Sequence, residues 1–243
     1  MNYELKNINI KEKILVQTLE KIREYLLDKT HLPVQPGLME GKMGVALFFF
    51  HYANYKNEVA YHDYAIDLID EIQEQIFRNT PLNYTSGLTG IGSCIAYLIR
   101  QGLIDGDSDE ILSDFDDNFN RHLTDRILYL SFDNITDIGT YLRFRYNGNN
   151  LTEKCCNMIN RLIYILNLHM NINPKYSEKV VKWLIAFSEI YPSAQINEQL
   201  KKQLLAFDLK NFSKSYSEIS LPFHGLRILS ELDNHHSSWL ALL

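Results

Sequence analysis

The sequence predicts an all-α fold built from repeated helical hairpins, and three observations support this prediction. Apolar residues recur at helical spacing over most of the 243 residues, and strand-like alternation never extends beyond a few residues. Two glycine-rich segments, 37–46 and 87–96, begin with Gly-Leu and lie about fifty residues apart, a period typical of repeat architectures. Each segment leads into an apolar helix pattern and then an amphipathic one. Inner apolar helices surrounded by outer amphipathic helices would satisfy this alternation.

The first predicted elements are an N-terminal helix and one hairpin. Residues 10–26 place apolar side chains on one face. A loop follows, because Pro33 and Pro36 are incompatible with a helix interior. The run 45–53 is apolar on all sides and predicts an interior helix, whereas 64–77 has opposite apolar and acidic faces, as an outer helix does.

The same pair of helices recurs along the rest of the chain. Inner helices are predicted to begin near Gly44, Gly92 and Gly139, and the later outer helices to span 109–129 and 151–168. Further pairs at 178–206 and from 221 to about 232 bring the total to about five hairpins. No linker interrupts this repetition, so residues 1–243 are predicted to form a single domain.

Composition limits the classes of partner. The net charge of −6 disfavours nucleic acid and anionic membrane surfaces, both of which need concentrated Lys and Arg. Three cysteines, two of them adjacent, make a poor disulfide framework and favour a reducing compartment. The N-terminus lacks a signal-peptide core and no apolar run reaches the length of a membrane span. We therefore expect a cytoplasmic protein that binds neither nucleic acid nor membrane.

The glycine-rich segments resemble the motifs that open the inner helices of the lanthionine synthetase C-like family. Gly37-Leu38-x-x-Gly41-x-x-Gly44 matches the family spacing in full, and Gly87-Leu88-x-Gly90-x-Gly92 matches it in shortened form. The resemblance is clear over residues 30–145 and continues beyond them only as a rhythm of helix pairs. It implies an α/α toroid, here incomplete, with about five hairpins where the family has about seven. The glycines that would serve this architecture are Gly37, Gly41, Gly44, Gly87, Gly90, Gly92 and Gly139.

The resemblance also implies a chemistry: zinc-assisted addition of a peptide cysteine thiol to a dehydrated serine or threonine, with two cysteines and one histidine holding the zinc. The nearest counterpart of the family's Cys-His-Gly motif is Phe223-His224-Gly225, in which phenylalanine stands where cysteine would. Cys94 and Cys155 lie on apolar helix stripes that are typical of a core. We therefore expect no bound metal and no other cofactor.

The candidate site is the mouth that the loops before the inner helices would share. Helix N-termini point free N–H groups into such a mouth, and glycines let the backbones approach closely. Glu40 precedes Gly41 and Thr89 precedes Gly90, so we interpret them as equivalent positions in two repeats. The polar residues predicted to line a peptide-binding mouth are Glu40, Lys42, Tyr84, Thr89, Asp137 and His224; solvated loops are the alternative.

Two classes of function remain open on the sequence. The first, which the eroded ligand motif favours, is a family member without an intact zinc site that binds or scaffolds a precursor peptide during peptide modification. Its partners would be that peptide or a peptide-modifying enzyme, and a ring with unclosed edges would also allow self-association. The alternative is an enzyme: a cyclase with divergent metal ligands, or a hydrolase on an α/α toroid using carboxylates such as Glu40 and Asp137.

Overall fold

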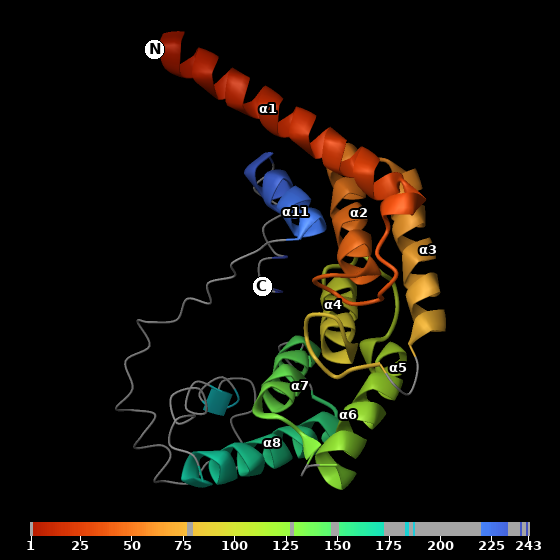
Figure 1. The fold of residues 1–243 in the computed structure, drawn as a ribbon, viewed down its shortest axis with the longest axis vertical. Coiled ribbons are helices and arrows are strands. Elements are labelled where there is room, and N and C mark those ends of the chain that lie inside the picture. The colour runs from red at the N-terminus through yellow and green to blue at the C-terminus, as the bar shows by residue number, and fades with distance from the viewer. Residues whose placement is uncertain are drawn as a thin grey trace. The chain divides into compact units, whose positions relative to one another are not determined.

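The structure is a computed structural model that describes most of the chain, and all secondary structure in the described part is helical (Figure 1). The described residues are 2–76, 80–126, 129–146, 151–172, 183–184, 187, 220–232, 239 and 242. The predicted fourth hairpin at 178–206 lies outside them except at 183–184 and 187. Of the helices in this part of the chain, none has both the length and the apolar character needed to cross a bilayer.

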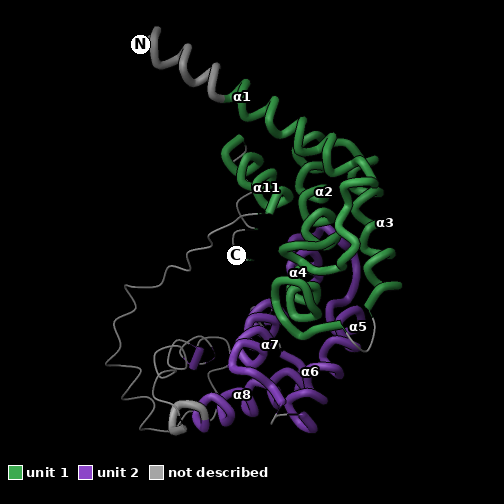
Figure 2. Tube along the Cα trace, in the orientation of Figure 1, with its two compact units in different colours: residues 1–94, 216–243 green, residues 95–215 purple. Residues whose placement is uncertain are grey.

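The chain divides into two compact units (Figure 2). Unit 1 comprises residues 1–94 and 216–243, and unit 2 comprises residues 95–215. Helix α4 (Leu88–Arg100) contributes its first half to unit 1 and its second half to unit 2. A single domain over residues 1–243 stays a prediction.

Unit 1 contains the first predicted hairpin, which the structure confirms. Helix α2 (Lys42–Lys56) is buried on every side from its first residue to Ala53, as its apolar sequence predicts. Helix α3 (Val59–Gln75) buries a single apolar stripe and exposes its acidic face. A tight turn joins them, with Asn57 in the left-handed region at φ 56°, a conformation that asparagine tolerates better than most residues.

The helices α1 (Asn2–Leu27), α2 and α11 (Leu221–Leu232) pack together in unit 1. A Cβ added at Gly44 of α2 would lie 3.4 Å from the Phe223 ring of α11. Four residues further along α2 and two residues further along α11, a Cβ at Gly225 would collide with the Phe48 ring. Because the two contacts occur in the same order, α2 and α11 run in the same direction with their N-termini together (Figure 1).

Unit 2 contains α5 (Ser108–Ile111), α6 (Ser113–Asp125), α7 (Phe132–Arg145) and α8 (Glu153–Ile172). The outer helix predicted at 109–129 is therefore two helices that break at Leu112 and end at Asp125. The start of α5 is set by Asp107, whose carboxylate accepts a hydrogen bond from the backbone N–H of Asp109 at 2.7 Å. An acidic residue here also complements the helix dipole.

A buried polar network joins α5, α6 and α7 in unit 2. The Tyr141 hydroxyl donates to Asp116 Oδ1 at 2.6 Å, and Arg145 Nη2 donates at 2.8 Å both to Asp116 Oδ2 and to Asp109 Oδ1. Asp116 and Arg145 are almost completely buried, so each charge depends on the other for compensation. The network fixes the packing of these helices.

Two inner helices begin earlier than the sequence predicts. Helix α4 starts at Leu88 rather than near Gly92, and α7 starts at Phe132 rather than near Gly139. The start of α7 is set by Ser131, whose hydroxyl accepts from the backbone N–H of Asn134 at 3.1 Å. Gly92 and Gly139 thus lie inside helices α4 and α7, and not in the loops before them.

The structure also corrects the alignment of the two repeats. The N–H of Lys42 donates to Gln35 O at 2.9 Å, and the N–H of Leu88 donates to Pro81 O at 2.8 Å, the same sequence separation in both cases. The repeat therefore aligns Gly41 and Gly44 with Gly87 and Gly90. Under this alignment Glu40 corresponds to Ser86 and Thr89 to Met43, so the predicted equivalence of Glu40 and Thr89 is wrong.

Candidate functional site

The loops that lead into α2 and α4 lie side by side in unit 1. The backbone N–H of Met39 donates to Thr85 O at 2.8 Å, and a side chain at Gly37 would collide with the backbone of Ser86. The first turn of α11 lies beside the first turn of α2. The N-terminal ends of these helices thus carry five of the predicted mouth residues to one end of unit 1: Glu40, Lys42, Tyr84, Thr89 and His224.

Two of these five residues are used within the fold. Lys42 is only 8% exposed, and its Nζ lies 2.6 Å from Glu71 Oε2 on α3. Thr89 is completely buried, and its hydroxyl donates to Leu82 O at 2.5 Å. The Lys42 ammonium group joins α2 to α3, and the Thr89 hydroxyl fixes the loop before α4. Because these polar groups already have partners, we do not expect either side chain to bind a peptide directly.

The other three remain accessible. Glu40 and His224 are exposed, and Tyr84 is half-buried with its hydroxyl donating to Leu242 O at 2.9 Å. An accessible carboxylate, imidazole and phenol ring therefore occupy the same end of unit 1. They supply an acceptor, a group that can donate or accept, and an apolar face.

Asp137 does not share the predicted loop setting. It lies within helix α7 of unit 2, past the cap formed by Ser131, where it is half-buried and has an interaction partner. The prediction that Asp137 stands in a loop before an inner helix is wrong, because the capping serine starts the helix before that position is reached.

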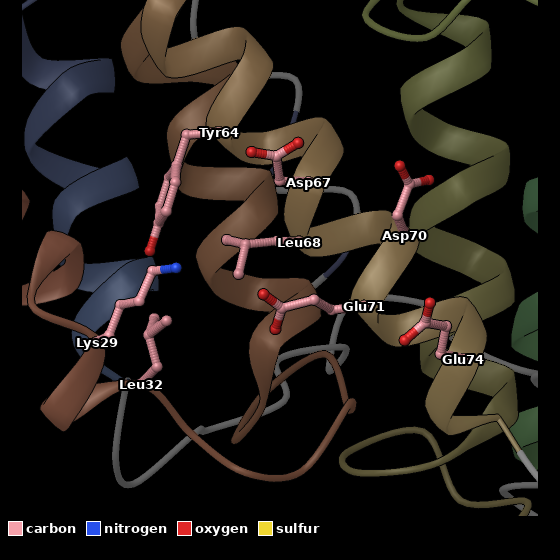
Figure 3. A pocket seen from close by; sticks show the side chains of 8 residues that line it. All are labelled: Lys29, Leu32, Tyr64, Asp67, Leu68, Asp70, Glu71 and Glu74. Atoms are coloured by element: carbon pink, nitrogen blue, oxygen red, sulfur yellow. The ribbon is translucent and has the colours of Figure 1, made fainter.

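An acidic pocket of about 280 Å³ lies along α3 in unit 1 (Figure 3). Figure 3 shows Lys29 and Tyr64 pointing toward each other at one end, and Asp70 and Glu74 at the other. Four carboxylates and a single lysine line it, so the pocket disfavours anionic ligands. The full lining is Lys29, Leu32, Tyr64, Asp67, Leu68, Asp70, Glu71 and Glu74.

The segment that resembles the zinc-ligand motif, Phe223-His224-Gly225, does not fit a zinc centre. A catalytic zinc needs converging Cys, His or carboxylate ligands and an open position. Phe223, which the resemblance places where a cysteine would stand, is completely buried, with its ring centroid 6.0 Å from that of Trp239. The adjacent His224 is exposed, so the two positions of the motif point into different environments.

The two buried cysteines offer no replacement ligands. Burial raises the pKa of the Cys94 thiol well above its usual range, which opposes the thiolate that zinc requires. Burial, reinforced by the charge of Asp116, raises the pKa of Cys155 to about 11. Within the part of the chain that the structure describes, no three His, Cys, Asp or Glu side chains are grouped closely enough to hold a metal ion.

One interaction at the site was missed by sequence reasoning. The acidic face of α3 predicts that Glu71 is an ordinary solvent-facing residue, whereas it compensates the charge of Lys42 at the start of a buried helix. A lysine next to an otherwise apolar run is the signal that could have indicated a partner, because a charge at a buried position needs one. The partner's identity depends on how α3 folds back on α2.

Comparison with known proteins identifies the family. Neither curated proteins nor solved structures gave a match. The family model described as lanthionine synthetase C-like protein matches residues 33–217, which is well over half of the chain and includes both glycine-rich segments. Together with the helical hairpins and the repeated glycine contacts, this match shows that the chain belongs to the lanthionine synthetase C-like family.

Proposed function

We propose that this family member binds a precursor peptide during peptide modification and does not itself carry out the zinc-assisted thiol addition. The observation that carries the proposal is the burial of Phe223 against Trp239 and α2, since the resemblance places Phe223 where the family's motif would have a zinc-binding cysteine. A phenyl ring has no donor atom for a metal.

Loss of this ligand has a direct chemical consequence. In the family's reaction the metal would supply activation of the peptide thiol, because a metal-bound thiol is deprotonated at neutral pH. His224 alone is one ligand, and neither buried cysteine is poised to form a thiolate. Without that activation, affinity for the peptide is the part of the family's activity that this chain can retain.

The accessible end of unit 1 supports peptide binding. Glu40, Tyr84 and His224 combine a charge, hydrogen-bonding groups and an aromatic face, which are the features that orient an extended peptide. The loops that carry them are fixed to each other by the Met39–Thr85 hydrogen bond. A preorganised surface loses less conformational entropy on binding.

The experiment combines a binding and a reaction measurement on the full chain. A fluorescein-labelled peptide containing dehydroalanine and one cysteine is added, with and without Zn²⁺. We expect saturable binding by fluorescence anisotropy, while the free thiol count and the peptide mass stay constant. A peptide with serine in place of cysteine serves as the matched control and should bind equally well.

The competing function gives the opposite pattern. An active cyclase would consume the thiol in a zinc-dependent manner without a change of peptide mass, and a hydrolase would produce smaller peptide fragments. Either result would contradict the proposed function. Failure of the protein to bind both peptides saturably would contradict it as well.

A further inference from the structure

A groove of about 810 Å³ lies between α6 and α8 of unit 2, whereas the proposed function uses loops of unit 1. Its lining is mainly polar and includes amide side chains from both helices. The residues are Asn120 from α6 and Glu153, Lys154, Asn157, Asn160, Arg161 and Tyr164 from α8.

Two contacts between the helices bracket the groove. Lys154 of α8 pairs with Asp117 of α6 at 2.5 Å, and Arg161 of α8 donates to the Thr124 hydroxyl of α6. The two contacts lie two turns apart on each helix and occur in the same order, so α6 and α8 run in the same direction. The stretch between them is about 10 Å long, which matches about three residues of extended peptide.

The amides between these contacts are available to a ligand. Asn120, Asn157 and Asn160 make no side-chain hydrogen bond to any residue that the structure describes. Asn160 Oδ1 is buried, so Asn160 can offer a ligand only the N–H groups of its amide. An asparagine amide carries one acceptor and two donors, so it can pair with both the N–H and the C=O of a peptide backbone.

The end of the groove at Arg161 and Tyr164 has the features that would favour particular side chains of a bound peptide. Arg161 is exposed and donates to a hydroxyl, and no carboxylate among the described residues forms an ion pair with it. Tyr164 is 63% exposed and Leu168, one turn beyond it, is 40% exposed. A cation beside an apolar patch complements a peptide with an acidic residue next to an apolar one.

We infer that the α6–α8 groove binds an extended peptide segment, with its backbone on the asparagine amides, an acidic side chain at Arg161 and an apolar side chain at Tyr164 and Leu168. This inference rests on the proposed function in that the segment belongs to the precursor peptide. It adds a second contact region, in unit 2, and a preference for an acidic-apolar pair.

The test uses labelled ten-residue peptides of glycine and serine that contain either Glu-Leu, Gln-Leu or Lys-Leu at the centre. Anisotropy at low salt should give the tightest binding for Glu-Leu and the weakest for Lys-Leu. Arg161→Ala should raise the Kd for Glu-Leu by at least about fivefold and leave Gln-Leu nearly unchanged. Asn157→Ala and Asn160→Ala should weaken Glu-Leu and Gln-Leu alike, because they act on the backbone.

Arg121→Ala is the matched control, since Arg121 is an exposed arginine of α6 that does not line the groove. If Arg161→Ala fails to fold, Asn157→Ala still tests the groove, because Asn157 is exposed and its replacement should not disturb packing. The inference is overturned if the wild-type chain does not distinguish Glu-Leu from Lys-Leu, or if the groove variants bind within twofold of wild type.

Failure of this inference and failure of the proposed function give different results. If the dehydroalanine peptide binds and its binding depends only on Glu40 and His224, the groove is excluded and the proposed function stands. If the groove variants weaken Glu-Leu binding while the full chain cyclises the dehydroalanine peptide, the groove stands and the proposed function is excluded.

Discussion

Gly44 and Gly90 occupy the same position in two successive repeats, because a Cβ on either residue would collide with the carbonyl oxygen of the residue six positions before it, Leu38 or Tyr84. In each repeat the loop folds back against the first turn of the helix it enters. The absence of a side chain is therefore required by close backbone approach, while φ at both glycines is ordinary.

Gly44→Ala and Gly90→Ala should each destabilise the protein by more than about 2 kcal/mol, because a backbone oxygen cannot move aside without displacing the loop. This is opposite in sign to the usual gain of up to about 1 kcal/mol when alanine replaces glycine within a helix. Urea unfolding followed by circular dichroism measures the change.

The control is Gly102→Ala, where φ is +66° but no atom lies within 4 Å of the added Cβ. It should cost about 1 kcal/mol through backbone strain alone. Equal stability of wild type, Gly44→Ala and Gly90→Ala would contradict the packing described for the loops.

The mouth residues should separate into two groups in an alanine scan. Glu40→Ala and His224→Ala should weaken peptide binding by about 1 kcal/mol each with little change in thermal midpoint, since both side chains are exposed. Lys42→Ala should instead lower the midpoint, because it leaves Glu71 without its partner and empties a buried position. Thr89→Val should act in the same way, through loss of its bond to Leu82 O.

Binding isotherms and melting curves on the same samples test this division. Asp67→Ala in the pocket on α3 serves as the binding control. If Lys42→Ala abolished binding without any loss of stability, Lys42 would be a ligand-contacting residue after all.

Stability should fall in alkaline solution. Burial, aided by the charge of Asp116, raises the pKa of Tyr141 well above its ordinary value of 10.0. Below pH 10 the hydroxyl is protonated in both states, and above it the unfolded chain loses the proton first. The contribution of Tyr141 is therefore complete below about pH 10 and is lost at about 1.4 kcal/mol per pH unit as the pH rises toward the folded pKa.

Thermal midpoints measured between about pH 8 and 11 should fall more steeply for the wild type than for Tyr141→Phe. The variant should also be less stable at neutral pH, because Asp116 loses a hydrogen bond. Tyr129→Phe, at an 86% exposed position, is the control and should follow the wild-type curve. Parallel curves for Tyr141→Phe and wild type would show that this hydroxyl is not buried.

Protein purified without added metal or chelator should contain well under one zinc per chain. The physical reason is the ligand set: Phe223, where the resemblance would place a cysteine, has no donor atom, and burial disfavours ionisation of Cys94. Elemental analysis measures the content, and Cys94→Ala should leave it unchanged. Stoichiometric zinc that disappears in Cys94→Ala or His224→Ala would instead support the cyclase alternative.

Local sequence determined much of this protein. The uniformly apolar run after Gly44 and the striped pattern of α3 predict a buried and a surface helix, because hydrophobic periodicity directly reports which faces avoid water. The glycine spacing predicted the family, whereas an altered ligand position at Phe223-His224-Gly225 stays a prediction. These properties are carried by residues close together in the chain, so no folded structure is needed to detect them.

Tertiary structure decided the rest. The repeat alignment depends on which carbonyl oxygen lies against Gly44 and which lies against Gly90. In the sequence, the Gly-Leu pairs at 37 and 87 suggested a different alignment of the two repeats, which is wrong. The Lys42–Glu71 pair and the groove between α6 and α8 depend on helices that meet across many residues of intervening chain. In the sequence Glu71 and Asn157 are indistinguishable from ordinary solvent-facing polar residues, because their roles arise from neighbours that only folding brings near.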